Sequence, residues 1–242
     1  MIALIIPTYN ESKSLPILLE RLAKDWHKQD MIVVVDDSEK DEYLKTEKII
    51  DDFSNSGFLI HIIEGQLKNG RGAAVLSAMK FLLETNKEIK FIIEADADGS
   101  HQSEDILSIK NYDASADFVI GSRYREESLI IGWSFSRRLL SRVLNTLIPR
   151  ILRIGTTDIT NGLRRYSLKA TKILCSYKIQ NKGFIYLSEQ ALYLKHAKIH
   201  PKEIPIIFAP RIAGKSSVTK RDLVNSFIGL IRVWKLRKIS YD

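Results

Sequence analysis

The feature that most constrains the fold is an alternation, throughout the first half of the chain, of short β-branched apolar runs and longer amphipathic segments. The apolar runs span residues 2–7, 31–37, 58–63, 90–96 and 117–122. Most of them stay apolar without period-two alternation, as strands covered on both faces do. The segments between them, 12–28, 41–56, 71–86 and 103–111, have the pattern of helices. This order predicts an α/β fold whose central sheet is mostly parallel, doubly wound and flanked by helices.

The second half has a different pattern. Residues 134–153 carry one apolar stripe at helical spacing, although Pro149 is expected to kink or break a helix there. Further along, 183–196 is expected to be a helix, 200–208 a strand and 221–239 a basic amphipathic helix. With no internal repeat or convincing linker, the simplest prediction is one domain with a C-terminal extension.

The formal net charge of +8 conceals an asymmetry between the two halves. Residues 1–122 hold 13 Lys and Arg against 22 Asp and Glu, whereas residues 123–242 hold 24 against 7. An acidic half suits a bound cation, and a basic half suits phosphates or an anionic surface.

Cysteine content and hydropathy exclude several classes of protein. The single cysteine, Cys175, rules out an intrachain disulfide and a cysteine metal cluster, which suits a reducing cytoplasm. The opening MIALIIPTYNE is expected to be a first strand rather than a signal peptide, because it lacks a basic leader and a cleavage site. No stretch approaches the ~18 apolar residues that a transmembrane helix requires. We therefore expect a cytoplasmic protein with no transmembrane helix.

Three polar stretches, PTYNE, DDS and DADGSH, each follow directly after a predicted strand. In a parallel sheet the carboxyl ends of strands share one edge, where ligands bind. Asp96 and Asp98, with one residue between them, could both turn toward a hard cation such as Mg²⁺ or Mn²⁺ that carries a nucleotide diphosphate. Because Asp and Gly also favour turns, a solvated turn remains the alternative.

Other polar groups are expected at the same edge. Asp36 and Asp37 could accept hydrogen bonds from a base or a ribose, or could merely form a charge pair at a helix N-terminus. Tyr9 and Glu11 follow the first strand. The glycine turn NGRGAA opens a helix and could offer backbone N–H groups to a phosphate, although it lacks the complete P-loop and dinucleotide-binding patterns.

Taken together, these stretches belong to a longer series of motifs. In order they are PTYNE, VDDS, GRGAA, EADADGSH, GSRY, the pair Arg137 and Ser141, TDITNGLRRY, NKGF followed by Glu189, and PRIAGKSS. The series resembles the family-2 glycosyltransferases, and among them most closely the dolichyl- or polyprenyl-phosphate mannose synthases. The resemblance covers residues 1 to about 220. It departs from the family in VDDSEKDE, which lacks the usual glycine turn, and in AGKSS, which replaces GESK.

The resemblance implies a GT-A-type catalytic domain over residues 1–220, followed by a basic amphipathic helix within 221–242. It also implies roles for individual residues. Asp96 and Asp98 would bind the metal cofactor, Mg²⁺ or Mn²⁺. The catalytic residues would be these two aspartates together with Arg123 and Arg137. The donor nucleotide would be bound by Pro7, Tyr9, Glu11, Asp36, Asp37 and Arg71. Donor and acceptor phosphates would be bound by Arg123, Arg137, Ser141, Arg211 and Lys215, since guanidinium groups suit phosphate oxygens.

The implied reaction transfers a hexose, most simply mannose from GDP-mannose, to a polyprenyl or dolichyl phosphate with inversion. An acceptor phosphate is already ionised near neutral pH, so no strong base is needed, and His101 is expected only to shape the site. The 134–153 stripe and the 221–239 segment would contact a membrane peripherally, on its cytoplasmic face, with Trp133 and Trp234 at the headgroup boundary. Packing of these helices on the catalytic domain is the alternative.

Three rival functions are weighed against this one. The same family includes enzymes with another donor, of the UDP-glucose type, or with a glycan acceptor. A sugar nucleotidyltransferase would normally begin with a glycine-rich, lysine-containing loop, which the sequence lacks. A nucleic-acid-binding protein would use the basic half, but no recognisable DNA or RNA motif is present and the basic residues are interleaved with aliphatic stripes. We therefore expect no nucleic-acid partner.

Overall fold

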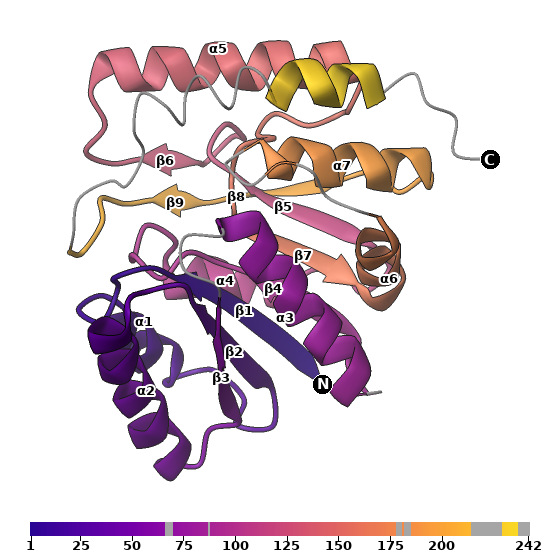
Figure 1. The fold of residues 1–242 in the computed structure, drawn as a ribbon. Helices are drawn as coiled ribbons and strands as arrows, with labels where there is room; N and C mark the ends of the chain where they lie inside the picture. The colour runs from indigo at the N-terminus through magenta and orange to yellow at the C-terminus, as the bar shows by residue number, and fades with distance from the viewer. Residues whose placement is uncertain (66–69, 87, 178–180, 182–184, 214–228, 237–242) are drawn as a thin grey trace.

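The structure, a computed structural model of the chain, describes all residues except 66–69, 87, 178–180, 182–184, 214–228 and 237–242. Its centre is a seven-stranded sheet in the order β3-β2-β1-β4-β7-β5-β8 (Figure 1). The strands are β1 (Ile2–Thr8), β2 (Met31–Asp36), β3 (Ile60–Glu64), β4 (Phe91–Glu94), β5 (Phe118–Ser122), β7 (Arg164–Ser167) and β8 (Lys202–Pro205). The prediction of a mostly parallel α/β sheet is confirmed.

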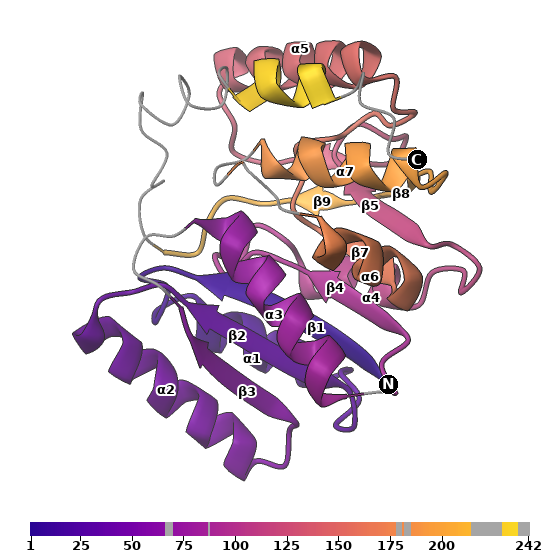
Figure 2. The same cartoon turned by 45° about the vertical axis from the view of Figure 1, so that its right-hand side comes forward.

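Helices cover both faces of the sheet (Figure 2). The helices in chain order are α1 (Leu15–Leu22), α2 (Lys40–Asn55), α3 (Arg71–Thr85), α4 (Ser103–Lys110), α5 (Phe135–Leu152), α6 (Leu168–Ser176) and α7 (Tyr186–His196). Alternate residues of β1 enter two separate cores: Ala3 and Ile5 pack with α3, α6 and α7, while Leu4 and Ile6 pack with α1 and α4. The unbroken apolar runs in the sequence therefore reflect strands buried on both faces.

Strand β7 is the exception to the parallel order, because it pairs antiparallel with both β4 and β5. The sequence pattern predicts neither this strand nor α6, since RRYS is too short and too polar to stand out. Its first residue, Arg164, pairs with Glu94 and Ile120 near the carboxyl ends of their strands. The loop that precedes β7 is thereby brought to the edge where the parallel strands end.

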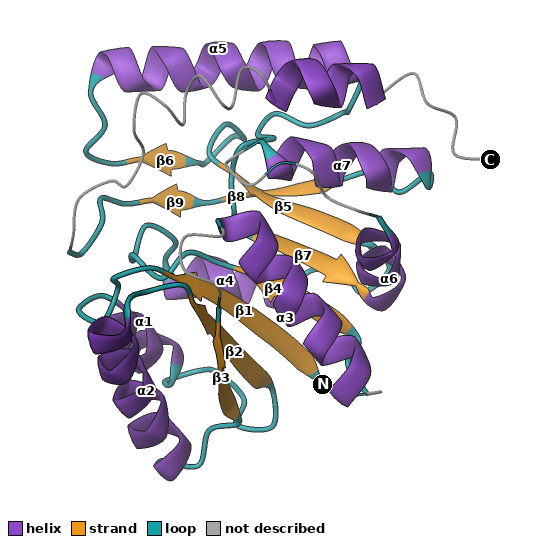
Figure 3. Cartoon of the chain, in the orientation of Figure 1, coloured by secondary structure: helices purple, strands orange, loops and turns teal. Residues whose placement is uncertain are grey.

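The expected strand over 200–208 is interrupted in the structure. It divides into β8 and the short β9 (Ile207–Phe208), which pairs with β6 (Leu129–Ile130) in a second, two-stranded sheet (Figure 3). The expected helix over 12–28 is also shorter, since α1 spans only Leu15–Leu22.

Helix α5 lies across the top of the molecule in Figure 1. It runs through Pro149 and continues to Leu152, so of the expected kink or break at this proline the break does not occur. Arg153 caps the helix in a left-handed conformation, with φ 55° and ψ 44°. Beside α5, residues 229–236 form a helical segment, drawn in yellow, whose Val233 is fully buried. None of the described helices is both long enough and apolar enough to cross a membrane.

Candidate active site

The predicted site residues meet at one edge of the sheet. The register pairs Thr8 with Asp36 at the ends of β1 and β2, and Glu94 with Arg164 where β4 ends and β7 begins. Hydrogen bonds join the loops beyond these ends; for example, the Asn10 backbone N–H donates to the side-chain Oγ of Ser38 at 2.8 Å. The parallel topology therefore places PTYNE, DDS and DADGSH side by side, as expected.

The DADGSH turn is held by its own polar atoms. Asp98 is buried, and its Oδ1 accepts from the Ser100 backbone N–H at 2.9 Å. Gly99 adopts φ 78°, a left-handed conformation in which other side chains are strained, and a Cβ there would press against the Ile212 side chain. The turn thus presents both aspartates from one rigid loop.

His101 is a structural member of this turn. Its Nδ1 accepts from the Asp96 backbone N–H at 3.0 Å, which leaves Nε2 to donate to Asn161 Oδ1 at 2.8 Å. Burial, together with the positive charge of Arg71, lowers the pKa of His101 to about 4. The imidazole is therefore neutral near pH 7 with both ring nitrogens engaged, and it is unsuited to act as a general base.

Asp96 is paired with a partly buried arginine from the first turn of α3. Arg71 forms an ion pair with the Asp96 carboxylate. The same guanidinium donates to the Tyr186 hydroxyl at 2.8 Å and to the Gly162 carbonyl at 2.9 Å. Arg71 was expected to bind the donor nucleotide, and the structure places it directly behind one of the two predicted metal ligands.

Beneath Arg71 lies a fully buried carboxylate, Glu94, which the sequence reading left out of the site. Its two oxygens accept from the hydroxyls of Tyr166 at 2.9 Å and Tyr186 at 3.0 Å. Glu94 Oε2 also lies 4.0 Å from Arg71 Nη2. The sequence shows only that Glu94 is a charged residue at the end of an apolar strand. It does not show which groups contact the carboxylate.

Asp98 is paired with the other predicted phosphate ligand, Arg211. Arg211 Nε lies 3.0 Å from Asp98 Oδ2, and its Nη1 lies 3.4 Å from Glu11 Oε1. The segment that carries Arg211 is held over the DADGSH turn, because the Ile212 N–H donates to the Asp98 carbonyl at 2.9 Å. Burial raises the pKa of Glu11, and the negative charge of Asp98 adds to this rise.

The paired acids at the end of β2 have unequal surroundings. Asp36 Oδ1 accepts from the Ser38 N–H at 2.8 Å, whereas its Oδ2 is buried with no hydrogen-bond partner among the described residues. Burial raises the pKa of Asp37 to about 6. A hydrogen bond from the Gly70 backbone lowers this pKa but does not cancel the effect of burial. Pro7 and Tyr9, half-buried, lie at the end of β1 beside these acids.

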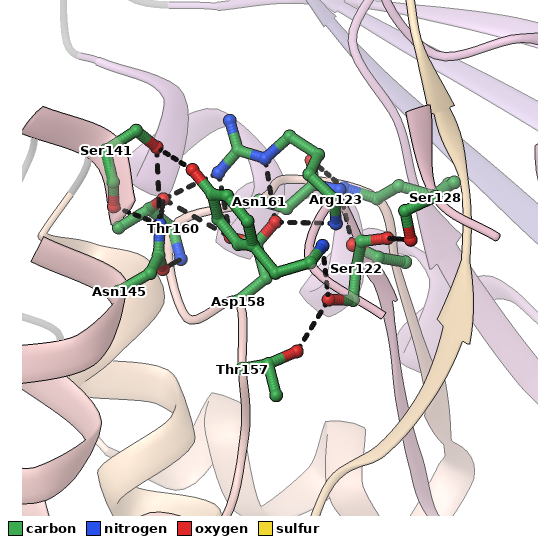
Figure 4. A network of polar contacts seen from close by, with 12 residues as sticks. Ser122, Arg123, Ser128, Ser141, Asn145, Thr157, Asp158, Thr160 and Asn161 are labelled. Carbon is green, nitrogen blue, oxygen red and sulfur yellow. Dashed lines mark hydrogen bonds and ion pairs between the residues drawn. The ribbon is translucent and has the colours of Figure 1, made fainter. Parts of the chain in front are cut away.

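Arg123 has a different environment from the one expected for a phosphate ligand. Its Nε and Nη2 each lie 2.7 Å from an oxygen of the buried Asp158, and Nη2 also donates to Thr160 at 2.7 Å (Figure 4). Asp158 belongs to the TDITNG motif and is not among the site residues predicted from the sequence. Arg123 directly follows β5. Because two of its guanidinium nitrogens bind Asp158 and Thr160, it joins the end of β5 to the loop before β7.

Helix α5 is tied to the same loop. Tyr124 donates its hydroxyl to Ser141 Oγ at 2.5 Å, and Asn145 donates to Thr160 Oγ1 at 2.9 Å. Arg137, one turn before Ser141, is exposed, and its guanidinium carbon lies 4.1 Å from the centre of the Trp133 ring. Although the residue is exposed overall, partial desolvation of the guanidinium and the positive charges of Arg123 and Arg211 lower its pKa. Lys215 lies outside the described residues.

The donor set suits a hard divalent ion. Asp96 and Asp98 offer only carboxylate oxygens, the ligands that Mg²⁺ and Mn²⁺ prefer. Among the described residues no group of three or more His, Cys, Asp and Glu side chains gathers into a complete metal site. Such a pair therefore fits an ion whose remaining ligands come from water and substrate phosphate, rather than one enclosed by protein.

Comparison with known proteins places these observations in a family. The sequence profile described as "Glycosyl transferase family 2" matches residues 3–174. An undecaprenyl-phosphate mannosyltransferase of Micrococcus luteus is 32% identical over 216 residues, which are 89% of this chain and 86% of that protein. A polyprenol monophosphomannose synthase of Mycolicibacterium smegmatis is 31% identical over 217 residues, covering 89% of this chain and 80% of that protein.

Solved structures with the same fold include two glycosyltransferases. A mannosyltransferase from Pyrobaculum calidifontis, in complex with GDP-Man and Mn²⁺, has a TM-score of 0.63 at 16% identity, with 96% of this chain and 64% of that chain covered. A glucosyl-3-phosphoglycerate synthase from Mycobacterium tuberculosis, in complex with Mn²⁺, UDP and glucosyl-3-phosphoglycerate, has a TM-score of 0.62 at 12% identity, with 98% and 79% covered. These likenesses confirm the expected GT-A-type fold.

Proposed function

Because the chain belongs to glycosyl transferase family 2, we propose that it transfers a hexose, mannose from GDP-mannose in the first instance, to a polyprenyl phosphate. The names of the two relatives at 31–32% identity support a mannosyl donor and a polyprenyl acceptor. The observation that carries the proposal is the contact of Arg211 with Asp98 at 3.0 Å. It joins the acidic, cation-binding side of the site to the arginines of the basic half.

On the donor side, Asp96 and Asp98 would hold Mg²⁺ or Mn²⁺. When bound, the ion would neutralise charge on the diphosphate as it departs. Asp36 and Asp37 would accept hydrogen bonds from the nucleoside, and the unpartnered Asp36 Oδ2 supports a missing donor there. Pro7, Tyr9 and Glu11 would line the same pocket, with Arg71 holding Asp96 from behind.

On the acceptor side, Arg137, Ser141 and Arg211 would bind the lipid phosphate, with Lys215 as a further ligand. Arg123 would support them by fixing the Asp158 loop, to which α5 is hydrogen-bonded.

In the proposed reaction, an oxygen of the acceptor phosphate attacks C1 of the sugar, the C1–O bond to the diphosphate breaks, and the nucleoside diphosphate leaves with the electron pair. Attack opposite the leaving group inverts the anomeric centre. A phosphate oxygen is already ionised near neutral pH, which is consistent with a neutral His101.

Membrane contact would come from the outer side of α5. Phe135 is 81% exposed, and Leu139, Leu140, Val143 and Leu147 are each 43–53% exposed. Such a continuous exposed apolar strip flanked by arginines suits a lipid surface. We therefore propose residues 1–220 as the catalytic domain and the C-terminal helix as part of a peripheral contact with the cytoplasmic face.

The test is a panel of nucleotide sugars assayed with a polyprenyl phosphate, with Mg²⁺, with Mn²⁺ and with a chelator. We expect radiolabel from GDP-mannose to enter an organic-extractable product only when a divalent ion is present. The anomeric configuration of that product, measured by NMR, should be inverted relative to the donor. A retained configuration, or transfer only to a water-soluble glycan, would overturn the proposal.

A further inference from the structure

A basic pocket lies on α5, apart from the predicted site for the acceptor phosphate. It has a volume of about 500 Å³ and is bounded by the last turns of α5 and the segment 153–157. Its lining includes Arg142, Arg150 and Arg153 and contains no aspartate or glutamate. Arg137 and Ser141 do not line it. Arg142 is five positions after Arg137, and five residues of an α-helix correspond to a rotation of about 140°. The two groups of arginines therefore face different directions.

The three arginines of this pocket have no acidic partner in the part of the chain that the structure describes. Within the described residues, no carboxylate oxygen lies within the 4.0 Å of an ion pair from any of their guanidinium nitrogens. Glu203 contacts the lining threonines, where it accepts from Thr156 Oγ1 at 2.7 Å and from the Thr157 N–H at 2.8 Å, and it forms no ion pair with the three arginines. Among the described residues, the lining of this pocket therefore carries three unpaired guanidinium groups, whereas Arg123 is paired with the buried Asp158.

The backbone at the end of α5 keeps one of these arginines at the pocket. Arg153 has the left-handed conformation that glycine usually supplies at a helix end, with φ 55° and ψ 44°. A side chain in this conformation is strained by about 1 kcal/mol. Local stability alone would favour glycine at this position, whereas an arginine here adds a third cation to the rim.

The pocket adjoins the exposed apolar strip of α5, which consists of Phe135, Leu139, Leu140, Val143 and Leu147. Arg142 and Arg150 follow Leu139 and Leu147 by three positions, and residues three apart are neighbours on a helix surface. Along another side of α5 lies the helical segment 229–236, whose Ile231 and Trp234 are 43% and 40% exposed (Figures 1 and 2). The expected ligand thus has an anionic head and an apolar tail.

We infer that this pocket binds the phosphate headgroup of an anionic phospholipid, whose acyl chains lie against the apolar strip of α5. The inference rests on the proposed membrane contact but adds a site separate from the one for the acceptor phosphate. Tyr124 touches both sites, because its hydroxyl bonds Ser141 while Arg142 lies 4.9 Å from the centre of its ring. A bound headgroup would therefore hold α5 at a defined depth next to the acceptor site.

The test uses a glycine in the pocket wall. A Cβ built on Gly155 meets no atom within 4 Å, and its backbone is not in the left-handed region, so a side chain can begin there without a clash or backbone strain. Gly155→Glu and Gly155→Gln have similar size and differ in charge. Binding of the full chain is measured by co-sedimentation with vesicles of phosphatidylcholine alone and of phosphatidylcholine mixed with phosphatidylglycerol.

We expect the wild-type chain and Gly155→Gln to prefer the phosphatidylglycerol vesicles. Gly155→Glu should bind them about five-fold more weakly, the effect of roughly one unit charge near an anionic surface. The double variant Arg150→Gln, Arg153→Gln should lose more than the charge-matched control Lys24→Gln, Lys169→Gln, whose lysines lie away from α5. Circular dichroism of every variant checks that the fold is kept.

Several results would overturn the inference. Equal binding by Gly155→Glu and Gly155→Gln would do so, as would equal loss in the two double variants. Competition by millimolar inorganic phosphate, without preference for phosphatidylglycerol, would assign the pocket to a soluble anion. A gel shift of DNA sensitive to Gly155→Glu, again without lipid preference, would assign it to nucleic acid. Failure of sugar transfer to a detergent-solubilised polyprenyl phosphate would instead reject the proposed function and leave the vesicle result standing.

Discussion

Arg71 and Asp96 form an ion pair at the point where the buried interior of the sheet meets the site. The guanidinium connects the first acid of DADGSH with Tyr186, Gly162 and the buried Glu94. The second acid of the motif, Asp98, is paired in the same way with Arg211. Each aspartate of the predicted metal pair is therefore held by a different arginine, one rooted in α3 and the other in the segment after β9.

Replacing Arg71 with methionine should destabilise the protein strongly. The substitution leaves Glu94 buried without its cation and the Gly162 carbonyl without its donor, and removing one partner of a buried ion pair typically costs about 3–5 kcal/mol. Urea unfolding should show a loss of about that size. Arg125→Met, at an exposed position, is the control and should change stability by less than about 0.5 kcal/mol. A loss below about 1 kcal/mol for Arg71→Met would show that the pair is not a structural anchor.

Asp98→Asn should nearly abolish sugar transfer while leaving the fold intact. The amide keeps the shape of the side chain and can still accept from Ser100, but it removes the charge needed for a divalent ion. We expect the rate to fall by at least about a hundredfold, as when charge stabilisation of a leaving group is lost. Excess chelator should have the same effect on the wild-type chain. Asp113→Asn, at an exposed acid remote from the site, should keep full activity.

Nucleotide affinity should fall as the pH drops through about 6. Burial raises the pKa of Asp37 to about 6, so the carboxylate, the form that accepts hydrogen bonds from a nucleoside, is lost at a higher pH than for an ordinary aspartate. The affinity for GDP, measured by calorimetry, should therefore be level above pH 7 and weaken toward pH 5. Asp37→Asn should bind weakly with a flatter profile. An unchanged wild-type affinity between pH 7 and pH 5 would remove Asp37 from the nucleoside site.

Ser141→Ala should affect the acceptor rather than the donor. Ser141 accepts from Tyr124 and is a candidate to donate its own proton to the acceptor phosphate. Loss of one such hydrogen bond is worth about 1 kcal/mol, or roughly five-fold in the KM for polyprenyl phosphate. The KM for the nucleotide sugar should stay constant. Tyr124→Phe, which removes only the partner hydroxyl, serves as the companion variant, and a donor KM that rises with the acceptor KM would contradict this role.

Phe135→Ser should weaken membrane binding without weakening the fold. The ring is 81% exposed, so little apolar burial is lost on substitution and the change in stability should stay within about 0.5 kcal/mol. Vesicle binding should fall by about tenfold or more, because burying such a side chain in lipid is worth about 1.5–3 kcal/mol. Leu44→Ser, at a residue that is 47% exposed on α2, is the control and should bind vesicles like wild type. Equal binding by all three chains would exclude the apolar strip as the membrane contact.

The sheet and the location of the site were predictable because both depend on local patterns. Unbroken apolar runs such as MIVVVD required strands buried on both faces, and the polar residues that end them had to meet at one edge. The grouping of Asp36, Asp37, Asp96 and Asp98 follows from that rule alone. The helical stripe over 134–153 was likewise visible, since its period is set by residues within a few turns of one another.

Partners distant in sequence were decided only by the tertiary structure. The sequence by itself determined a doubly wound α/β chain with acids at the carboxyl edge and a basic, helical second half. It did not show that β7 would insert antiparallel between β4 and β5, nor that Arg71 would lie against Asp96 and Arg123 against Asp158. It also left open which side of α5 would remain uncovered. The physical reason is that a charge is visible in the sequence, whereas its counter-ion is selected by packing between elements that lie tens of residues apart.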